Sequence, residues 1–305
     1  MKAAVIGVGH LGQHHARLLA SLPGVSLAGV VDINKDRAAR IAGDYGTTAF
    51  GDPGEISGLE IAVIATPTES HSAIARPLIE AGVHTLIEKP IAQTLAEADA
   101  LIAAAKQSGA VLAVGHSERF NPAVTAARPY VNDPRFIEVH RLGTQLGRSL
   151  DIDVVLDLMI HDLDLILSLV PSEIESVEAV GVPVLTPKVD IANARVRFKN
   201  GCIANLTASR ISRDQIRKIR FFQRERYVSI DTAAREVEMY QLMPQPGGLP
   251  KIDGGKLTVP GDEPLKSELE DFVAAVREKR APAVPGEQGR AALALALRIV
   301  ELMRQ

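Results

Sequence analysis

Asp157 and His161 stand at positions i and i+4 of a stretch, Val154–Leu169, whose apolar residues recur with helical periodicity. On an α-helix this spacing places both side chains on one face, one turn apart. An imidazole oriented by a nearby carboxylate is a natural general base, because its pKa lies near neutrality. The same spacing also suits a surface ion pair, so the pair alone leaves both roles open.

A second candidate for chemistry is the segment Glu88-Lys89-Pro90, which directly follows the apolar run Thr85–Ile87. A lysine at a strand end can donate a hydrogen bond to a reacting hydroxyl group and stabilise negative charge that develops on its oxygen. Pro90 stiffens the turn that presents Lys89. The competing interpretation is an ordinary surface lysine at the end of a strand.

A third polar segment, residues 115–122, follows the apolar run Val111–Val114 at the point where the sequence pattern changes. Domain junctions are preferred ligand sites. Arg119 and Asn121 are therefore candidates for substrate contact, and Arg119 suits a carboxylate or a phosphate. A polar linker with Asn121-Pro122 as a turn is the competing interpretation.

Three glycines, Gly7, Gly9 and Gly12, have G-x-G-x-x-G spacing between an apolar run and a helical stretch. This pattern binds dinucleotides, because the turn is tight and the backbone can approach a pyrophosphate at a helix N-terminus. A second apolar run ends at Asp32, about 20 residues beyond the last glycine, where a ribose-binding acid is expected. Asp32 favours NAD, since it repels a 2′-phosphate, whereas Asn34-Lys35 leaves some room for NADP.

Further cofactor contacts are expected where parallel strands end. The turn Thr66-Pro67 follows the run Ile61–Ala65 and is expected to lie along the cofactor, although it also suits a helix start capped by Thr68. The residues predicted to bind the cofactor are Gly7, Gly9, His10, Leu11, Gly12, Asp32, Ile33, Thr66, Pro67, His71, Glu88 and Lys89.

No metal site is expected. His10, His14 and His15 look like a ligand cluster, but three ligands there would compete with the pyrophosphate. Asp162 is predicted to face away from Asp157 and His161, which disfavours a metal at that pair. The single cysteine excludes a cysteine-built metal site and an intrachain disulfide.

The first third of the chain alternates strand and helix patterns, which indicates a parallel sheet covered on both faces. The expected strands are Ala3–Val8, Ser26–Val31, Ile61–Ala65, Thr85–Ile87 and Val111–Val114. The expected helices are Leu11–Ser21, Lys35–Asp44, Ser70–Glu80 and Leu95–Ser108, with glycines beyond their ends and a capping box at Thr94 and Glu97.

After about Phe120 the pattern becomes one of antiparallel strands, with a hairpin around Asn200-Gly201 as its clearest turn. Residues 245–255 indicate a loop, and two helices, Leu265–Lys279 and Gly286–Met303, close the chain. The expected fold is α/β: a Rossmann doubly wound parallel sheet over residues 1–120, and an α+β domain with a large, mostly antiparallel sheet over residues 121–305. Such an open sheet needs cover, so a homodimer or homotetramer through this sheet is expected.

Composition excludes several classes of partner. The chain has 305 residues, a net charge of −3 and no tryptophan, which disfavours nucleic acid. It has no apolar run long enough to span a bilayer and no pattern of a signal peptide, so we expect a cytoplasmic protein without a membrane partner.

Together these motifs resemble the Gfo/Idh/MocA (glucose–fructose oxidoreductase/inositol dehydrogenase) family. The resemblance covers nearly the whole chain and rests on the segments VIGVGHLG, VVDIN, ATPTESH, EKP, GHSERFNP, DLMIHDLD, ARVRFKNG and ELEDFVAAV. It implies an NAD- or NADP-binding Rossmann domain and a C-terminal sheet that often forms an oligomer interface.

The resemblance also implies site roles. Lys89 corresponds to the EKP lysine, and Asp157 and His161 to the family's D-x-x-x-H pair, in which His161 is the general base and Asp157 orients it. The predicted catalytic residues are thus Lys89, Asp157 and His161, and the predicted substrate contacts are Lys89, Arg119, Asn121 and His161. Many members carry Gly-Gly shortly before the Asp; here residues 151–154 read DIDV, so the local loop differs.

We therefore expect an NAD-dependent dehydrogenase that oxidises a secondary hydroxyl group of a sugar, cyclitol or nucleotide sugar to a ketone. The segments GHSERFNPA and DLMIHDLDL are most similar to the branch that acts on UDP-N-acetylglucosamine-type sugars as 3-dehydrogenases. Two other classes stay open: an NAD-dependent glycoside hydrolase that oxidises transiently and then eliminates, and a non-catalytic NAD(P)-sensing regulator. The expected pocket loops, Gly143–Asp153 and Ile211–Ile219, carry no code for the substrate.

Overall fold

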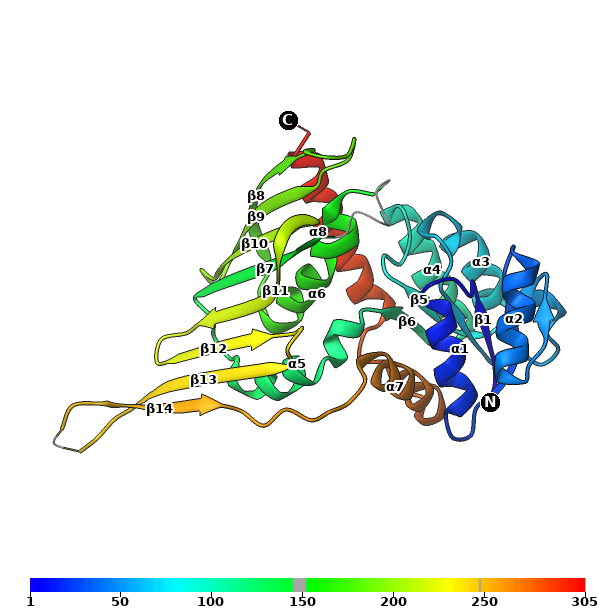
Figure 1. Cartoon of the computed structure of the whole chain (residues 1–305), viewed down its shortest axis with the longest axis horizontal. Coiled ribbons are helices and arrows are strands. Elements are labelled where there is room, and N and C mark those ends of the chain that lie inside the picture. Colours follow the sequence, from blue (N-terminus) through cyan, green and yellow to red (C-terminus); the bar gives the residue numbers. More distant parts are fainter. Residues whose placement is uncertain (145–151, 247, 305) are drawn as a thin grey trace. The chain divides into compact units, whose positions relative to one another are not determined.

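The computed structural model describes residues 1–144, 152–246 and 248–304. The chain forms two compact units (Figure 1). The first contains Met1–Ser117 and Leu265–Leu293, and the second contains Glu118–Pro264 and Ala294–Gln305. The change of unit after Ser117 lies close to the predicted boundary at residue 120. The sequence did not indicate that the chain returns to the first unit at Leu265.

In the described residues the first unit has a six-stranded parallel sheet with the order β3-β2-β1-β4-β5-β6. Its strands are β1 (Lys2–Ile6), β2 (Ser26–Val31), β3 (Ala49–Phe50), β4 (Ile61–Ile64), β5 (His84–Glu88) and β6 (Leu112–Gly115). The strand order reverses at β1 and β4, and ligands of such sheets bind outside the carboxyl ends of the strands at this point. The predicted Rossmann fold is confirmed.

Helices and short 3-10 turns connect these strands. The elements are α1 (Gly12–Ser21), α2 (Lys35–Tyr45), η1 (Pro53–Glu55), α3 (Thr68–Glu80) and α4 (Leu95–Ser108). The predicted caps are present: Gly46 and Gly109 adopt left-handed φ values of 62° and 74°, and Thr94 and Glu97 form a capping box. The expected cap at Thr68 is wrong, because Pro67 precedes the first turn of α3 and Thr68 lies inside it.

One face of the parallel sheet is covered by α1, α2 and a helix from the far end of the chain, α7 (Pro264–Glu278). Leu269, Phe272 and Val273 of α7 belong to the same buried cluster as Leu86 of β5 and Ala113 of β6. Because these apolar side chains need one another for burial, α7 completes the core of the first unit. The next helix, α8 (Gly286–Leu302), continues from the first unit into the second.

The second unit begins with short helical segments and contains an eight-stranded sheet, β14-β13-β12-β11-β7-β10-β9-β8, in the described residues. All neighbouring strands are antiparallel except β7 and β10. The elements are η2 (Ser117–Phe120), α5 (Pro122–Ala127), η3 (Arg128–Tyr130), β7 (Phe136–Thr144), η4 (Val155–Met159), α6 (Ile160–Leu169), β8 (Ile174–Val182), β9 (Ile191–Phe198), β10 (Ile203–Ser209), β11 (Ile211–Phe222), β12 (Arg226–Asp231), β13 (Glu236–Met243) and β14 (Lys251–Lys256).

The predicted mostly antiparallel sheet and the hairpin β9–β10 are confirmed, with Gly201 at φ 86° in its turn. Two local predictions are wrong. Residues 211–219 are not a loop but part of β11, whose register shifts between Ile211 and Ile216. Residues 251–255, predicted as loop, pair with β13 as β14. The helix predicted over Val154–Leu169 is present, and its first turns are the π-helical η4. Most of the predicted loop 143–153 lies outside the described residues.

Candidate active site

The turn after β1 requires glycine at two positions, because a side chain there would clash with neighbouring atoms. Gly7 has φ 83°, and a Cβ there would lie 2.7 Å from Thr66 Cγ2 and 2.8 Å from the Ala65 carbonyl oxygen. A Cβ on Gly12 would lie 1.8 Å from the Gly7 carbonyl oxygen. Any larger residue at either position would therefore separate α1 from the strands β1 and β4. These two glycines allow the close packing that the spacing predicts.

The middle glycine has a different environment. A Cβ on Gly9 would meet only the end of the Arg37 side chain, with Nη1 at 3.4 Å, so no other backbone crowds this position. No side chain caps the N-terminus of α1 at Leu11, and both Leu11 and His10 are exposed. Bare backbone beside an uncapped helix N-terminus suits the pyrophosphate of a dinucleotide.

Asp32 lies at the end of β2 and is almost fully buried, with 9% exposure. Its Oδ2 accepts a hydrogen bond from Val8 N at 2.9 Å, and its Oδ1 accepts one from Asn34 N at 2.8 Å. The guanidinium of Arg37 lies 3.6 Å from Oδ2. Sequence reasoning missed Arg37, in the first turns of α2, as the cation beside Asp32. It named Asn34-Lys35 instead as the segment that leaves room for NADP. Asn34 caps α2, because its side chain accepts a hydrogen bond from Arg37 N. Ile33, which was predicted to bind the cofactor, is fully exposed.

His71 joins two turns at the carboxyl ends of the strands. Its Nε2 lies 2.9 Å from the Thr66 carbonyl oxygen and its Nδ1 lies 2.9 Å from the Pro90 carbonyl oxygen. The ring is 1% exposed, and this burial lowers the pKa of His71 although both hydrogen bonds raise it. Thr66 Oγ1 accepts a further hydrogen bond from Ser70 Oγ at 2.8 Å, which fixes the turn before α3.

Lys89 follows the last residue of β5 and is half-buried, and its peptide bond to Pro90 is cis. The preceding carboxylate, Glu88, accepts from the Lys89 backbone N–H at 3.3 Å through Oε2, while its Oε1 lies 2.8 Å from His15 Nε2. Burial raises the pKa of Glu88, but the hydrogen bonds and charges of His15 and Lys89 together lower it, so the pKa of Glu88 is lowered overall. Glu88 is therefore an internal anion.

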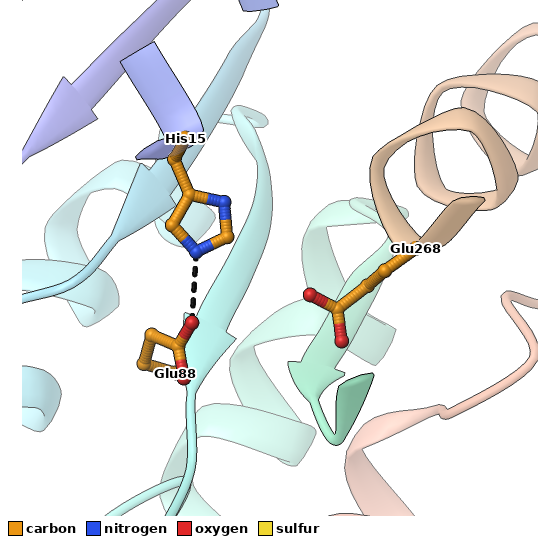
Figure 2. A group of neighbouring side chains, drawn as sticks. All are labelled: His15, Glu88 and Glu268. Atoms are coloured by element: carbon orange, nitrogen blue, oxygen red, sulfur yellow. Dashed lines mark hydrogen bonds and ion pairs between the residues drawn. The ribbon is translucent and has the colours of Figure 1, made fainter. Parts of the chain in front are cut away.

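A third titratable group lies close to this pair. Glu268 of α7 is 2% exposed and points toward His15 and Glu88 (Figure 2). Donor atoms of the three residues lie within 4.8 Å of one another, and their types suit a metal ion. The three residues come from α1, β5 and α7, so no local spacing could have indicated the cluster. Of the three histidines near the glycine turn, only His15 is fully buried.

In the second unit, Asp157 and His161 are both half-buried and lie on successive but different helical segments. Asp157 belongs to the π-helical η4, and His161 lies in the first turn of α6. The predicted helix is thus present at both residues, but Asp157 lies in a π-turn, which is wider than an α-turn. Single π-turns inside helices are frequent at functional sites.

The residues predicted to contact substrate at the domain junction have partners inside the second unit. Arg119 binds Asp164 in a bidentate ion pair with distances of 2.5 and 2.8 Å, and both side chains are buried. Asn121 Nδ2 donates to Glu118 Oε2 and to the Thr232 carbonyl oxygen, each at 3.1 Å. These contacts support a structural role for both residues.

A second buried ion pair lies beside the first. Arg141 donates two hydrogen bonds of 2.8 Å to Asp162 and one of 3.0 Å to Glu118. Burial raises the pKa of Asp162 even though Arg141 opposes it. Asp162 therefore serves the internal packing of α6 against β7.

Two family models match the chain. The model described as an oxidoreductase family with an NAD-binding Rossmann fold matches residues 1–116, and the GFO/IDH/MocA C-terminal domain matches residues 133–225. No described helix is long and apolar enough to cross a membrane.

Individual proteins are similar over most or nearly all of the chain. UDP-N-acetylglucosamine 3-dehydrogenase from Acidithiobacillus ferrooxidans is 41% identical over 98% of this chain and 96% of its own length. A solved structure of that enzyme superposes with a TM-score of 0.93, covering 100% of this chain and 99% of the other. The scyllo-inositol 2-dehydrogenase (NAD(+)) of Bacillus subtilis is 30% identical over 70% of this chain and 68% of its own.

Proposed function

Because this chain belongs to the GFO/IDH/MocA oxidoreductase family and its first unit is an NAD-binding Rossmann domain, we propose that it oxidises the 3-hydroxyl group of a UDP-N-acetylhexosamine to a ketone. The observation that carries this proposal is the full-length similarity to UDP-N-acetylglucosamine 3-dehydrogenase, at 41% identity and a TM-score of 0.93. The similarity to the inositol dehydrogenases is lower, at 30% identity for one and 26% for another, which favours the nucleotide sugar over a cyclitol.

The cofactor fits the first unit on structural grounds. At Gly9 only the end of the Arg37 side chain lies near the uncapped start of α1, where the pyrophosphate would bind, and Asp32 would receive the ribose hydroxyls. NAD, when bound, supplies the acceptor for the hydride that leaves the carbinol carbon. NADP suits the site less well, because the buried carboxylate of Asp32 would repel a 2′-phosphate.

The chain's own residues would handle the proton and the developing charge. His161 takes the proton of the substrate hydroxyl group, and Asp157 orients its imidazole. Lys89 donates a hydrogen bond to the same oxygen, which stabilises the negative charge that develops before the ketone forms. The O–H proton thus goes to His161 while the C–H hydrogen leaves as hydride, so that atoms and charge balance.

The test is a substrate panel with the purified protein. UDP-N-acetylglucosamine, UDP-glucose, myo-inositol and scyllo-inositol are each incubated with NAD, and reduction of the cofactor is followed by absorbance. We expect the highest kcat/KM with UDP-N-acetylglucosamine and a loss of roughly 100-fold or more in kcat for Lys89→Ala. Lys266→Ala, an exposed lysine on α7, is the matched control.

Three results would overturn the proposal. Faster turnover of an inositol would contradict the substrate class. Release of free sugar without net reduction of NAD would indicate a glycoside hydrolase. NAD binding without turnover of any sugar would indicate a regulator.

We further propose that the open face of the second sheet packs against a second copy of this chain. Four aromatic rings form a continuous row across β7, β11, β12 and β13, with centroid distances of 5.6, 5.2 and 6.5 Å between Phe136, Phe222, Tyr227 and Tyr240. Phe222 and Tyr240 are 37% and 40% exposed, which is typical of a surface that is covered by a partner. Light scattering after size exclusion tests this: a dimer or tetramer supports it, and a monomer contradicts it.

A further inference from the structure

Two buried histidines contact the two residues that flank Lys89 in the chain. The residue before the lysine, Glu88, is bound through its side chain by His15 of α1 at 2.8 Å. The residue after the lysine, Pro90, is bound through its carbonyl oxygen by His71 of α3 at 2.9 Å. Both imidazoles are buried, with 0% and 1% exposure, so neither one contacts solvent.

The protonation state of His71 decides how many of its two carbonyl contacts are hydrogen bonds. Both of its ring nitrogens face carbonyl oxygens, which only accept hydrogen bonds. A neutral imidazole carries one N–H and satisfies one of the two carbonyls, whereas an imidazolium satisfies both. Burial lowers the pKa of His71 and the nearby charge of Glu88 raises it. A neutral ring with its N–H on Nδ1 donates to the turn at Pro90, and the imidazolium donates to the turns at Pro90 and at Thr66.

The contact of His15 belongs to a charged cluster. Glu88 and Glu268 approach the imidazole from β5 and α7, and Lys89 adds a positive charge that lowers the pKa of Glu88. Apolar residues would fill the same volume without the cost of burying charge. A buried imidazole and two buried carboxylates are therefore a costly way to pack a core, but they fix the direction of the Glu88 carboxylate.

We propose that His15 and His71 are positioning residues that clamp the turn on both sides of Lys89 and hold its ammonium group toward the substrate oxygen. His15 acts through Glu88, whose other oxygen accepts from the Lys89 backbone N–H at 3.3 Å. His71 acts through the Pro90 carbonyl oxygen. This inference rests on the catalytic role proposed for Lys89.

The side chain of His71 offers a matched pair of variants. An asparagine amide nitrogen replaces Nδ1, so His71→Asn retains a donor toward Pro90 and loses the contact with Thr66. A glutamine amide nitrogen replaces Nε2, so His71→Gln retains a donor toward Thr66 and loses the contact with Pro90. The clamp predicts that kcat stays within about threefold of the parent in His71→Asn and falls on the order of 10-fold to 100-fold in His71→Gln, since small misplacements of a reacting group are that costly.

His15 is tested in the same way. His15→Gln retains a neutral donor toward Glu88, and His15→Met fills the volume without one. We expect His15→Met to lower kcat on the order of 10-fold or more, with KM for NAD within about threefold of the parent, and His15→Gln to recover most of kcat. A general loss of folding would instead lower the melting temperature and the active fraction of all four variants alike.

A second readout does not depend on turnover. The rate at which acetic anhydride labels the Lys89 amine is measured by mass spectrometry in the NAD-bound enzyme, with Lys266 in the same sample as the internal reference. We expect the labelling rate of Lys89 to change at least about twofold in His71→Gln and in His15→Met. The labelling rate of Lys266 should stay unchanged, because only the turn beside Lys89 loses its contacts.

The two proposals fail in different ways. Full turnover by Lys89→Ala would remove the proposed role of Lys89, while the labelling experiment would still decide whether the turn is clamped. Parent-like kcat and parent-like labelling in both His71→Gln and His15→Met would overturn the clamp. Equal losses in His71→Asn and His71→Gln would also overturn it. If His15→Met does not fold, the His71 pair decides alone.

Discussion

The backbone N–H of Val8 donates a hydrogen bond of 2.9 Å to Oδ2 of Asp32. The carboxylate expected to bind the ribose thus also holds the glycine turn at the end of β1. Cofactor choice and the shape of the turn are therefore coupled through one side chain, and a change at Asp32 has two effects at once.

We expect replacement of Asp32 to change both the hold on the glycine turn and the choice between NAD and NADP. In Asp32→Asn one backbone donor loses its charged acceptor, which is worth about 1.5–3 kcal/mol. We expect KM for NAD to rise roughly 10-fold or more, and KM for NADP to fall, because the repulsion of a 2′-phosphate disappears while Arg37 stays nearby. Steady-state kinetics with both cofactors measure this. In the double variant with Arg37→Ala the gain for NADP should vanish; a gain that persists would contradict the role of Arg37.

We expect one glycine substitution to damage the protein and another to stabilise it. Gly12→Ala places a methyl group 1.8 Å from the Gly7 carbonyl oxygen, so we expect NAD binding to be lost. Gly43→Ala, inside α2, meets nothing within 4 Å and should stabilise the protein by about 0.5–1 kcal/mol. Urea unfolding and a fluorescence titration with NADH measure both. Parent-like NADH affinity in Gly12→Ala would show that the turn is looser than the contacts indicate.

Arg119 should behave as a structural residue. Removing its guanidinium in Arg119→Leu leaves the buried carboxylate of Asp164 without its bidentate partner, which typically costs about 3–5 kcal/mol. We expect a large drop in unfolding free energy, and partial recovery in the double variant with Asp164→Leu. An unchanged stability together with a raised KM for the sugar nucleotide would instead support the substrate contact predicted from the sequence.

We expect the Asp190 carboxylate to stabilise the folded chain above about pH 4 and to lose this effect in acid. Its carboxylate is buried, which raises its pKa, but the backbone N–H groups of Leu185, Thr186 and Val184 and the Thr186 hydroxyl lower it to about 2. Because the folded-state pKa lies below the unfolded value of about 3.9, the contribution is complete above about pH 4 and is lost as the pH falls toward 2. The measurement is the urea midpoint between pH 2 and 6.

Asp190→Asn is the comparison for that experiment. It removes the charge and retains one acceptor, so its midpoint should be lower than that of the parent above pH 4, and the gap should narrow toward pH 2. A constant gap across this range would show that the carboxylate titrates alike in the folded and unfolded chains.

Periodicity and glycine spacing were sufficient to predict the main strands and helices of the first unit, because buried parallel strands and capped helices have strong local signals, but they missed the short β3 and η1. The same reasoning misplaced β14, since Gly254 and Gly255 suggest a loop, and the pairing that makes it a strand comes from β13. Similarly, a helical period over Val154–Leu169 does not distinguish the π-helical η4 from an α-helix.

The candidate site was predicted in part. The turn glycines, Asp32 and the turn that carries Lys89 all lie at the carboxyl ends of the parallel strands, as their positions in the sequence indicated. The contact between His15 and Glu88 joins residues separated by 73 positions, and no spacing rule reaches that far. The catalytic roles of Lys89, Asp157 and His161 and the cytoplasmic location stay predictions.

The chain leaves the first unit after Ser117 and re-enters it at Leu265. During synthesis on a ribosome, the cofactor-binding unit therefore lacks α7, and with it Leu269, Phe272 and Glu268, until the sheet of the second unit has already been made. The unit that is encoded first completes its core last. A fragment ending near residue 120 would expose the apolar surface around Leu86 and Ala113, so the NAD-binding unit cannot mature as an independent N-terminal module.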